Sequence, residues 1–297
     1  MRIAYQGEPG AYSEAAALRC AADADLLPCH SFEEVFAAVR EGRASHGILP
    51  MENSIGGSIH RNYDLLVEHE LPIVGEVVLA VDHCLMALPG TPLAGVRVVH
   101  SHPQALAQCE RYLQRLANVE IVAVYDTAGG AKIIRQQQLR DAAAVASERA
   151  AEVFGLEVLA RGIQDYDANV TRFVVVARSA SAAVPPKAGE AGGGCKTSIV
   201  FTLPNGPGAL FKALSVFAFR DINLTKLESR PLRGRPWDYL FYADLDVRRD
   251  SLECGRALVH LAEIAQWVRT LGSYAAWIEP AGDAASGPHP ARVIQSW

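Results

Sequence analysis

Apolar residues in the first 178 positions alternate between short continuous runs and stretches of helical pattern. The short runs predict strands at 2–5, 46–49, 73–79, 84–87, 96–100, 119–125, 142–146 and 172–177. The stretches between them predict helices at 13–22, 31–40, 59–69, 104–116, 128–137 and 147–154. Repeated strand-then-helix order is typical of an α/β fold with largely parallel sheets and helices on both faces.

The pattern changes towards the C-terminus. Strands are expected at 197–203, 223–230, 238–247 and 273–278, and helices at 208–219 and 251–268. This βαββαβ order predicts a ferredoxin-like domain, a superfold that carries no function by itself. We expect the domain at 196–280, preceded by a linker at 179–195 made of small residues, proline and glycine, and followed by a poorly ordered tail at 281–297.

Composition narrows the class of protein. A chain of 297 residues that is 50% hydrophobic has room for roughly two domains. A net charge of -5 without a basic stripe argues against nucleic-acid partners, and the absence of an apolar run of ~18 residues argues against a membrane span. The six cysteines show no metal-ligand spacing, which is typical of reduced thiols. The chain enters its first strand without a signal or transit peptide, so we expect it in the cytoplasm.

Polar residues follow four of the expected strands, at 6–7, 50–54, 101–104 and 126–129. Ligands of open α/β sheets bind beyond the carboxyl ends of the strands, so these segments predict a small-molecule cleft. Ser101 and Thr127 also suit N-caps, and a helix N-terminus with a hydroxyl is well placed to hold a carboxylate. Glu52 and Asn53, between proline and glycine, are expected in a tight turn.

The segment 169–173, Asn-Val-Thr-Arg-Phe, opens the last strand of the first part. Arg172 precedes an apolar run there. An arginine beside a hydrophobic strand is either paired in a core or holds an anion, and the residues alone leave both interpretations open.

These segments resemble the prephenate dehydratases. The matching stretches are YQGEPGAYSE (5–14), PMENS (50–54), SHPQA (101–105), DTA (126–128) and TRF (171–173). The C-terminal part looks like the ACT domain of that family, with PGAL at 207–210 and ESRP at 228–231. The resemblance covers roughly residues 1–280. Segments 57–66, 101–109, 162–165 and 169–171 look especially like plant-type arogenate dehydratases, and Val170 stands where bacterial enzymes often differ.

The resemblance implies a fold and a cleft. The catalytic domain, 1–178, would consist of two α/β subdomains related to type II periplasmic binding proteins, 1–80 plus 170–178 and 81–169. The active site would lie between the two subdomains.

The resemblance also implies a reaction. Prephenate would lose carbon dioxide and hydroxide to give phenylpyruvate, and the alternative is conversion of arogenate to L-phenylalanine, by this enzyme or by one that uses both substrates. A positioned donor for the leaving hydroxide contributes on the order of 10²–10⁴-fold. Following the family, that donor would be Thr171, with Glu52 as rival if burial raises its pKa. No metal or organic cofactor is expected.

The remaining site residues would bind the substrate. Arg172 would grip a carboxylate with two hydrogen bonds. The others implied for this role are Asn53, Ser54, Ser101, Gln104, Thr127, Ala128 and Phe173. Among the histidines, His60, His83 and His102 are the ones of interest.

The ACT-like domain implies regulation by phenylalanine. Gly208 permits close backbone approach at the start of a helix whose N–H groups can face a carboxylate. The residues implied for this site are Asn205, Gly208, Ala209, Leu210, Glu228, Ser229 and Arg230. Such sites lie at subunit interfaces in this family, so a homo-oligomer, dimer or tetramer, is expected. The alternatives are an amino-acid sensor that has lost catalysis and a chorismate mutase fusion, for which no helical domain precedes the first strand.

Overall fold

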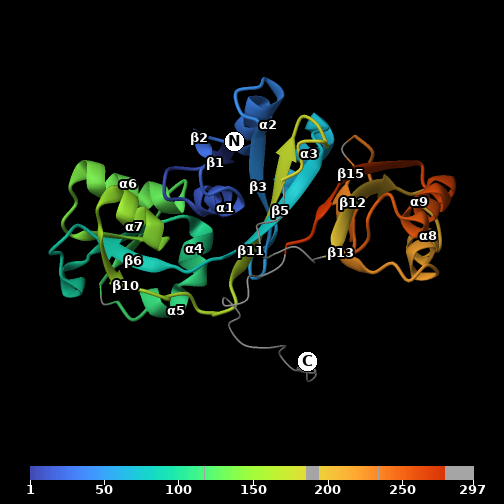
Figure 1. Ribbon diagram of the computed structural model, residues 1–297. Coiled ribbons are helices and arrows are strands. Elements are labelled where there is room, and N and C mark those ends of the chain that lie inside the picture. Colours follow the sequence, from blue (N-terminus) through green and yellow to red (C-terminus); the bar gives the residue numbers. More distant parts are fainter. Residues whose placement is uncertain (117, 185–193, 233, 278–297) are drawn as a thin grey trace.

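Three lobes in a row make up the molecule (Figure 1). The computed structural model describes residues 1–116, 118–184, 194–232 and 234–277. The middle lobe contains the N-terminal strands together with β11, the second lobe contains the segment from β6 to β10, and the third contains the C-terminal elements. Most of the expected linker (185–193) and all of the expected tail (281–297) lie outside the described residues.

The middle lobe, subdomain 1, is a mixed sheet. Its strands are β1 (Arg2–Gln6), β2 (Asp25–Cys29), β3 (His46–Asn53), β5 (Ile73–Ala80) and β11 (Val170–Ala177), with the short β4 (Gly57–Ser58) beside β3. β1 runs parallel to β2 and β3, whereas the returning β11 is antiparallel to both β3 and β5. The helices are α1 (Tyr12–Cys20), α2 (Phe32–Arg40) and α3 (His60–His69).

Subdomain 2 is built around a five-stranded sheet in the order β10-β6-β9-β7-β8. Its strands are β6 (Cys84–Ala87), β7 (Val98–Ser101), β8 (Glu120–Ala123), β9 (Ala142–Ala146) and β10 (Glu157–Ala160). Its helices are α4 (Pro103–Gln108), α5 (Glu110–Leu113), α6 (Thr127–Gln137) and α7 (Glu148–Phe154), and the 3-10 turn η1 spans Leu93–Gly95. The central strand β9, Ala-Ala-Ala-Val-Ala, is buried throughout, and its small side chains let helices pack closely on the sheet.

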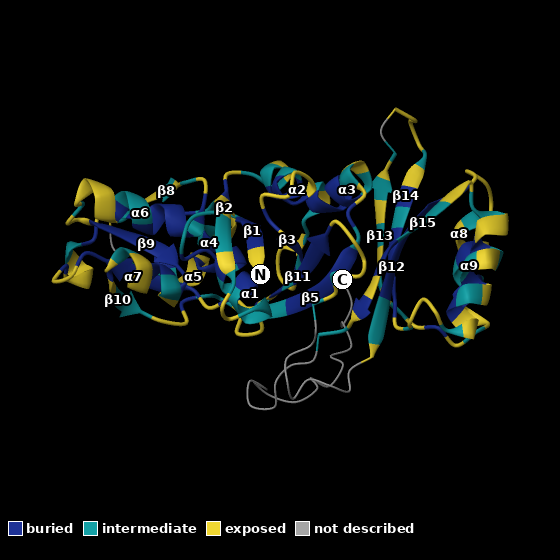
Figure 2. Ribbon diagram, turned by 45° about the horizontal axis from the view of Figure 1, so that its top comes forward, coloured by how far each residue is buried: buried dark blue, intermediate teal, exposed yellow. Residues whose placement is uncertain are grey.

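The third lobe has the expected βαββαβ order. Its elements are β12 (Cys195–Thr202), α8 (Ala209–Ala218), β13 (Leu224–Pro231), β14 (Tyr239–Leu245), α9 (Leu252–Ile264) and β15 (Trp267–Ala275). The strands are antiparallel in the order β13-β14-β12-β15. Both helices cover one face of this sheet, and the opposite face turns towards subdomain 1 (Figure 2).

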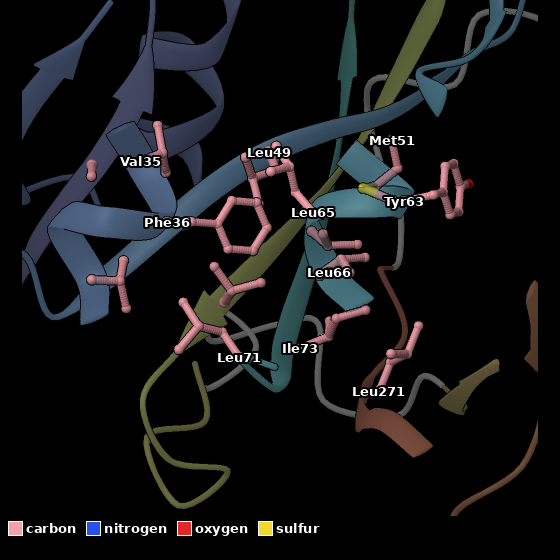
Figure 3. Close-up of a cluster of buried hydrophobic side chains, with 14 of the residues drawn as sticks. Val35, Phe36, Leu49, Met51, Tyr63, Leu65, Leu66, Leu71, Ile73 and Leu271 are labelled. Carbon is pink, nitrogen blue, oxygen red and sulfur yellow. The ribbon is translucent and has the colours of Figure 1, made fainter. Parts of the chain in front are cut away.

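The sheet of the middle lobe joins the sheet of the third lobe. β15 runs parallel to β5 at one residue pair, Gly272 with Ile73, so the described strands of both lobes form one ten-stranded sheet. A hydrophobic core crosses the junction: Leu271 of β15 lies near Leu71 and Ile73 of subdomain 1 (Figure 3). Tyr242 of β14 stacks edge-on against Tyr63 of α3. Shared core and shared sheet couple the third lobe to the middle lobe.

The expected fold class is confirmed: two α/β subdomains and a ferredoxin-like domain. Within it, the expectation of largely parallel sheets is wrong, because β11 returns to subdomain 1 between two strands that it meets antiparallel. Three short strands, β2, β4 and β10, were not expected. The single helix expected at 104–116 is two, because the backbone at Cys109 (φ -116°, ψ 19°) leaves helical geometry. The last strand begins at Trp267 rather than 273.

Candidate active site

A cleft of about 530 Å³ lies between subdomains 1 and 2. It is open to solvent and takes residues from both subdomains. Its lining is Gln6, Ala11, Tyr12, Ser13, His30, Ser31, Phe32, Glu33, Pro50, Asn53, Ile59, Val81, His83, His102, Gln104, Ala105, Gln108, Tyr125, Asp126, Thr127, Thr171 and Phe173. This volume is large enough for a small organic acid.

Four helices begin at the rim of this cleft. The cleft lining includes the first residues of α1, α2 and α6, and the N-cap of α4, His102. The N-cap of α1, Ala11, offers no side-chain cap, so the first N–H groups of α1 remain free of such a bond. Helix N-termini carry partial positive charge. They give the cleft an affinity for carboxylates, although its described lining holds neither lysine nor arginine.

Thr171 and Asn53 face each other on β11 and β3. The Asn53 amide nitrogen donates to the Thr171 hydroxyl at 3.0 Å and to the Asn169 side-chain oxygen at 2.7 Å. The Asn53 oxygen accepts from the backbone N–H of Gly56 at 2.7 Å. Thr171 Oγ1 already accepts a hydrogen bond from Asn53, and its own O–H has no acceptor among the described residues. This O–H is therefore available to a ligand in the cleft.

A polar network extends from this pair into subdomain 2. Gln108 donates to Asn53 at 3.1 Å and accepts from Asn169 at 3.1 Å. His83 Nε2 lies 2.9 Å from the Gln108 side-chain oxygen, and His83 Nδ1 lies 3.1 Å from the Tyr12 hydroxyl. Burial lowers the pKa of His83, which favours its neutral form. The network thus fixes the orientation of Asn53 from both sides of the cleft.

Asp126 is the buried acid of the cleft. One of its carboxylate oxygens caps α6, accepting from Ala128 N at 2.7 Å. Burial raises the pKa of Asp126, and the nearby charge of Glu8 adds to the effect. Gly7 approaches so closely that an added Cβ would lie 2.5 Å from Asp126 Oδ2, so only glycine fits there.

Contacts across the mouth of the cleft hold the subdomains together. Glu8 bonds Tyr125 and Lys132, both at 2.8 Å, and the pKa of Glu8 is lowered because these bonds outweigh its burial. Gly10 packs against Ala150 of α7, where an added Cβ would lie 2.7 Å from the Ala150 Cα. The two subdomains are therefore in direct contact beside the cleft.

The structure places half of the ten expected catalytic and substrate-binding residues in the lining of the cleft. These are Asn53, Gln104, Thr127, Thr171 and Phe173. Ser101 is buried in β7 and donates to Val145 O at 2.6 Å, and Ala128 is buried in α6. Ser54 is not part of the cleft lining, and its hydroxyl donates a hydrogen bond to the backbone oxygen of Ala168. The N-cap of α4 is His102, one residue after Ser101, which was expected there. The N-cap of α6 is Asp126, one residue before the expected Thr127.

The positions of Glu52 and Arg172 differ from those expected from the sequence. The expected tight turn at Glu52 and Asn53 is wrong, because β3 continues through both residues. Successive side chains of a strand point to opposite faces, so when Asn53 and Thr171 face the cleft, Glu52 and Arg172 face away. Arg172 bonds Glu76 and Asp244 at 2.7 Å each, and Glu52 lies 3.0 Å from Lys226. Neither residue lines the cleft.

Sequence reasoning missed several lining residues. Gln108 is the last residue of α4 and gives no local signal, and Tyr12, His30 and Asp126 gained their role only through the fold. His83 and His102, noted as histidines of interest, do line the cleft, whereas His60 lies 3.2 Å from Glu228 of the third lobe. Among the described residues, no cluster of three or more His, Cys, Asp or Glu could hold a metal ion.

The residues expected to bind phenylalanine fall into two groups. Asn205, Gly208 and Leu210 lie exposed at the start of α8, where Gly208 adopts a left-handed backbone (φ 72°). Glu228 and Arg230 point towards subdomain 1, where they bond Ser58 at 2.6 Å and Asp64 at 3.2 Å. Of the remaining members, Ser229 is exposed on the other face of β13, and Ala209 is the first residue of α8.

A family model described as prephenate dehydratase matches residues 3–181. The chain belongs to the prephenate dehydratase family. It is 52% identical to arogenate dehydratase/prephenate dehydratase 2 of Arabidopsis thaliana, over 92% of this chain and 72% of that protein. It is 50% identical to arogenate dehydratase 1 of Petunia hybrida, over 92% of this chain and 66% of that protein. It is therefore a dehydratase, an enzyme of the carbon–oxygen lyase class.

Solved structures of the family share its fold. A prephenate dehydratase from Arthrobacter aurescens, in complex with L-Phe, superposes with a TM-score of 0.82 at 33% identity, covering 93% of this chain and 90% of that one. A protein described as a quorum quenching acylase, GqqA, superposes with a TM-score of 0.84 at 39% identity, covering 93% of this chain and 98% of that one.

The expectation of a cytoplasmic location is wrong. Relatives from Arabidopsis thaliana at 52% and 50% identity are named chloroplastic, and this contradicts the expectation. None of the helices in the described part of the chain is long and apolar enough to span a membrane.

Proposed function

We propose that this enzyme converts prephenate to phenylpyruvate by decarboxylating dehydration. Arogenate is the proposed alternative substrate, because relatives of this chain are named arogenate dehydratases. The observation that carries the proposal is the Thr171 hydroxyl. It lies in a cleft surrounded by helix N-termini, accepts one hydrogen bond from Asn53, and keeps its proton for a ligand.

In the proposed reaction the bond between the ring and its carboxyl group breaks, and its electron pair enters the ring. The carbon–oxygen bond across the ring breaks at the same time, and hydroxide leaves with the other electron pair and is protonated to water. Thr171 donates a hydrogen bond that strengthens as charge develops on the departing oxygen. The N-terminus of α1, whose first N–H groups have no side-chain cap, holds the side-chain carboxylate, which does not react.

The proton for the departing hydroxide has two proposed sources in the cleft. Water hydrogen-bonded to Thr171 is one, and Asp126 is the other, because burial raises its pKa and favours its protonated form. Asp126 takes the place that sequence reasoning assigned to Glu52, which binds Lys226 on the far side of β3.

We propose further that L-phenylalanine binds the ACT-like third lobe and inhibits the enzyme. The Arthrobacter aurescens relative was solved with L-Phe. The exposed turn before α8, with Gly208 in a left-handed conformation, leaves open space in which a small ligand can approach the backbone.

A homo-oligomer, dimer or tetramer, is part of the same proposal. β13 ends the ten-stranded sheet, and Leu227 on it is 42% exposed. An edge strand with free backbone groups is a template for a strand of a second copy.

The test is turnover of the purified chain on prephenate and on arogenate, each with and without phenylalanine. Prephenate turnover suppressed by phenylalanine supports the main proposal. Faster arogenate turnover keeps the mechanism and changes the substrate. Phenylalanine binding without turnover of either substrate points to a sensor. Acylase activity without dehydration, as the name of GqqA suggests for that protein, rejects the proposal.

A further inference from the structure

The face of β3 and β11 that points away from the cleft is bonded to the third lobe. On β3 and β11, the pair Glu52 and Arg172 stands directly next to the cleft-facing pair Asn53 and Thr171. Arg172 Nη1 lies 2.7 Å from Asp244 Oδ2 of β14, and Arg172 Nη2 donates to the Tyr274 hydroxyl of β15 at 2.8 Å. Each cleft residue therefore has a neighbour that contacts the C-terminal domain.

These contacts form a closed, buried and charge-balanced network. Arg172 Nε donates to Glu76 Oε2 at 2.7 Å, and Lys196 of β12 donates to the other Glu76 oxygen at 2.7 Å. The Glu76 side chain is 0% exposed and that of Arg172 is 14% exposed. Burial opposes ionisation of Glu76, yet the charges of Arg172 and Lys196 outweigh it, and the pKa of Glu76 is lowered. A guanidinium held on three sides has one orientation.

We propose that Arg172 is a positioning residue that holds Thr171 in place and makes this place depend on the sheet of the C-terminal domain. The inference rests on the proposed role of Thr171 in the dehydration. Thr171 and Arg172 are consecutive on β11, and the bonds of Arg172 to Asp244 and Tyr274 tie this strand to β14 and β15. A displacement of β11 relative to those strands would therefore change the position of the Thr171 hydroxyl. A misplacement of about 1 Å at a reacting group can cost on the order of 10²-fold in rate.

The geometry opposes a substrate-binding role for Arg172. Its side chain faces away from the cleft, and its described partners already take Nε, Nη1 and Nη2. To reach a substrate it would have to leave Glu76 and Asp244, and the uncompensated buried charges would strongly disfavour that movement. The two roles make different kinetic predictions.

The test uses Asp244→Asn in the full-length enzyme. This change keeps the shape of the side chain, lies in the C-terminal domain, and removes the charge that faces Arg172. We expect kcat to fall by about tenfold with KM nearly unchanged, and inhibition by phenylalanine to weaken by about tenfold. The matched control is Glu70→Gln, which breaks the Arg269–Glu70 pair across the same domain boundary without touching β3 or β11. It should leave kcat and KM at wild-type values.

A double-mutant cycle tests the pair. Arg172→Lys keeps the charge and loses the planar fork, so its effect on kcat should not add to that of Asp244→Asn. If Asp244→Asn does not fold, Tyr274→Phe, which removes one hydrogen bond from the same guanidinium, takes its place.

Three outcomes overturn the inference. Wild-type kcat and phenylalanine response in a folded Asp244→Asn enzyme would do so, even if its melting temperature fell as in the control. A raised KM in Arg172→Lys, with kcat unchanged in Asp244→Asn, would assign Arg172 to the substrate instead. A wild-type enzyme that dehydrates neither substrate would reject the proposed function, and the inference with it, which distinguishes the two failures.

Discussion

Thr171 depends on its neighbours for the orientation of its hydroxyl. Asn53 occupies the acceptor side of the oxygen, and Gln108 and Asn169 hold Asn53 in the required rotamer. A threonine hydroxyl is a weak acid, so its contribution comes from a pre-oriented hydrogen bond rather than from proton release. At the scale of a residue, the proposed role of Thr171 therefore depends on the orientation of its hydroxyl.

Thr171→Ala should lower kcat by about 10²- to 10³-fold, because it removes the donor aimed at the leaving oxygen. Thr171→Ser is the matched variant: it keeps the hydroxyl and should retain most of the activity. Steady-state kinetics on the better substrate measures both. A Thr171→Ala enzyme with nearly full turnover would leave the hydroxyl without a role in the reaction.

His83 makes stability depend on pH. Its pKa is lowered in the fold by burial, so below about 6.5 the unfolded chain takes up a proton that the folded protein does not. The stability present above that pH is therefore lost as pH falls towards the folded pKa. The pKa values of His69 and His100 are lowered in the same direction.

His83→Gln should shrink the drop in melting temperature between about pH 7.5 and about pH 5.5, while part of the drop remains from the other two histidines. Thermal unfolding followed by circular dichroism at both pH values measures it. An unchanged drop in the variant would mean that His83 is not the residue that resists protonation.

At the scale of an element, successive residues of β3 and β11 face alternately the cleft and the C-terminal domain. Odd positions Asn53 and Thr171 face the cleft, while even positions Glu52 and Arg172 face the C-terminal domain. The loops before α1 and α6 then bring helix N-termini to the same space. This strand pair thereby lines the cleft on one face and contacts the C-terminal domain on the other.

Gly10→Ala should disturb the contact between the subdomains. The backbone of Gly10 is left-handed (φ +89°), and the new Cβ would meet Ala150 of the other subdomain at 2.7 Å. We expect KM to rise severalfold because the cleft cannot keep its width. Gly155→Ala is the control, with a left-handed backbone (φ +60°) but open space around it. It should cost about 1 kcal/mol of stability and leave KM unchanged; equal KM effects in both would contradict the contact argument.

At the scale of the whole molecule, the C-terminal domain is joined to subdomain 1 by a sheet, a core and an ion-pair network. Gly272 meets Ile73 as one backbone pair, and no larger residue fits there, since a Cβ would lie 2.1 Å from the Ile73 carbonyl oxygen. The C-terminal domain is thus attached at several points to the sheet that carries Thr171.

Gly272→Ala should separate the C-terminal domain from the catalytic sheet. We expect unfolding to resolve into two transitions in scanning calorimetry and the phenylalanine response to weaken. Gly255→Ala, within α9 and with open space around it, is the control and should keep a single transition. A single transition and normal inhibition in Gly272→Ala would show that the junction is not needed for coupling.

The sequence by itself determined the class of fold and the residues that had to be near a ligand. Continuous apolar runs and the βαββαβ order are local properties, so they predicted the α/β class of the first part and the ferredoxin-like C-terminal domain. The division of the first part into two subdomains was implied by the family resemblance. Segments after strand ends predicted Asn53, Gln104 and Thr127 in the cleft, and the family resemblance implied Thr171 and Phe173 there. Short exposed strands such as β2 and β10 carry too weak a pattern and were missed.

Only the tertiary structure decided whether each of these side chains points into the cleft or away from it. Arg172 could be paired in a core or hold an anion, and its side was settled by the antiparallel insertion of β11 between β3 and β5, a long-range pairing. Gln108, Asp126 and the free N-terminus of α1 likewise became part of the site because distant segments meet there. Local pattern specifies elements, whereas the facing of a strand depends on partners more than a hundred residues away.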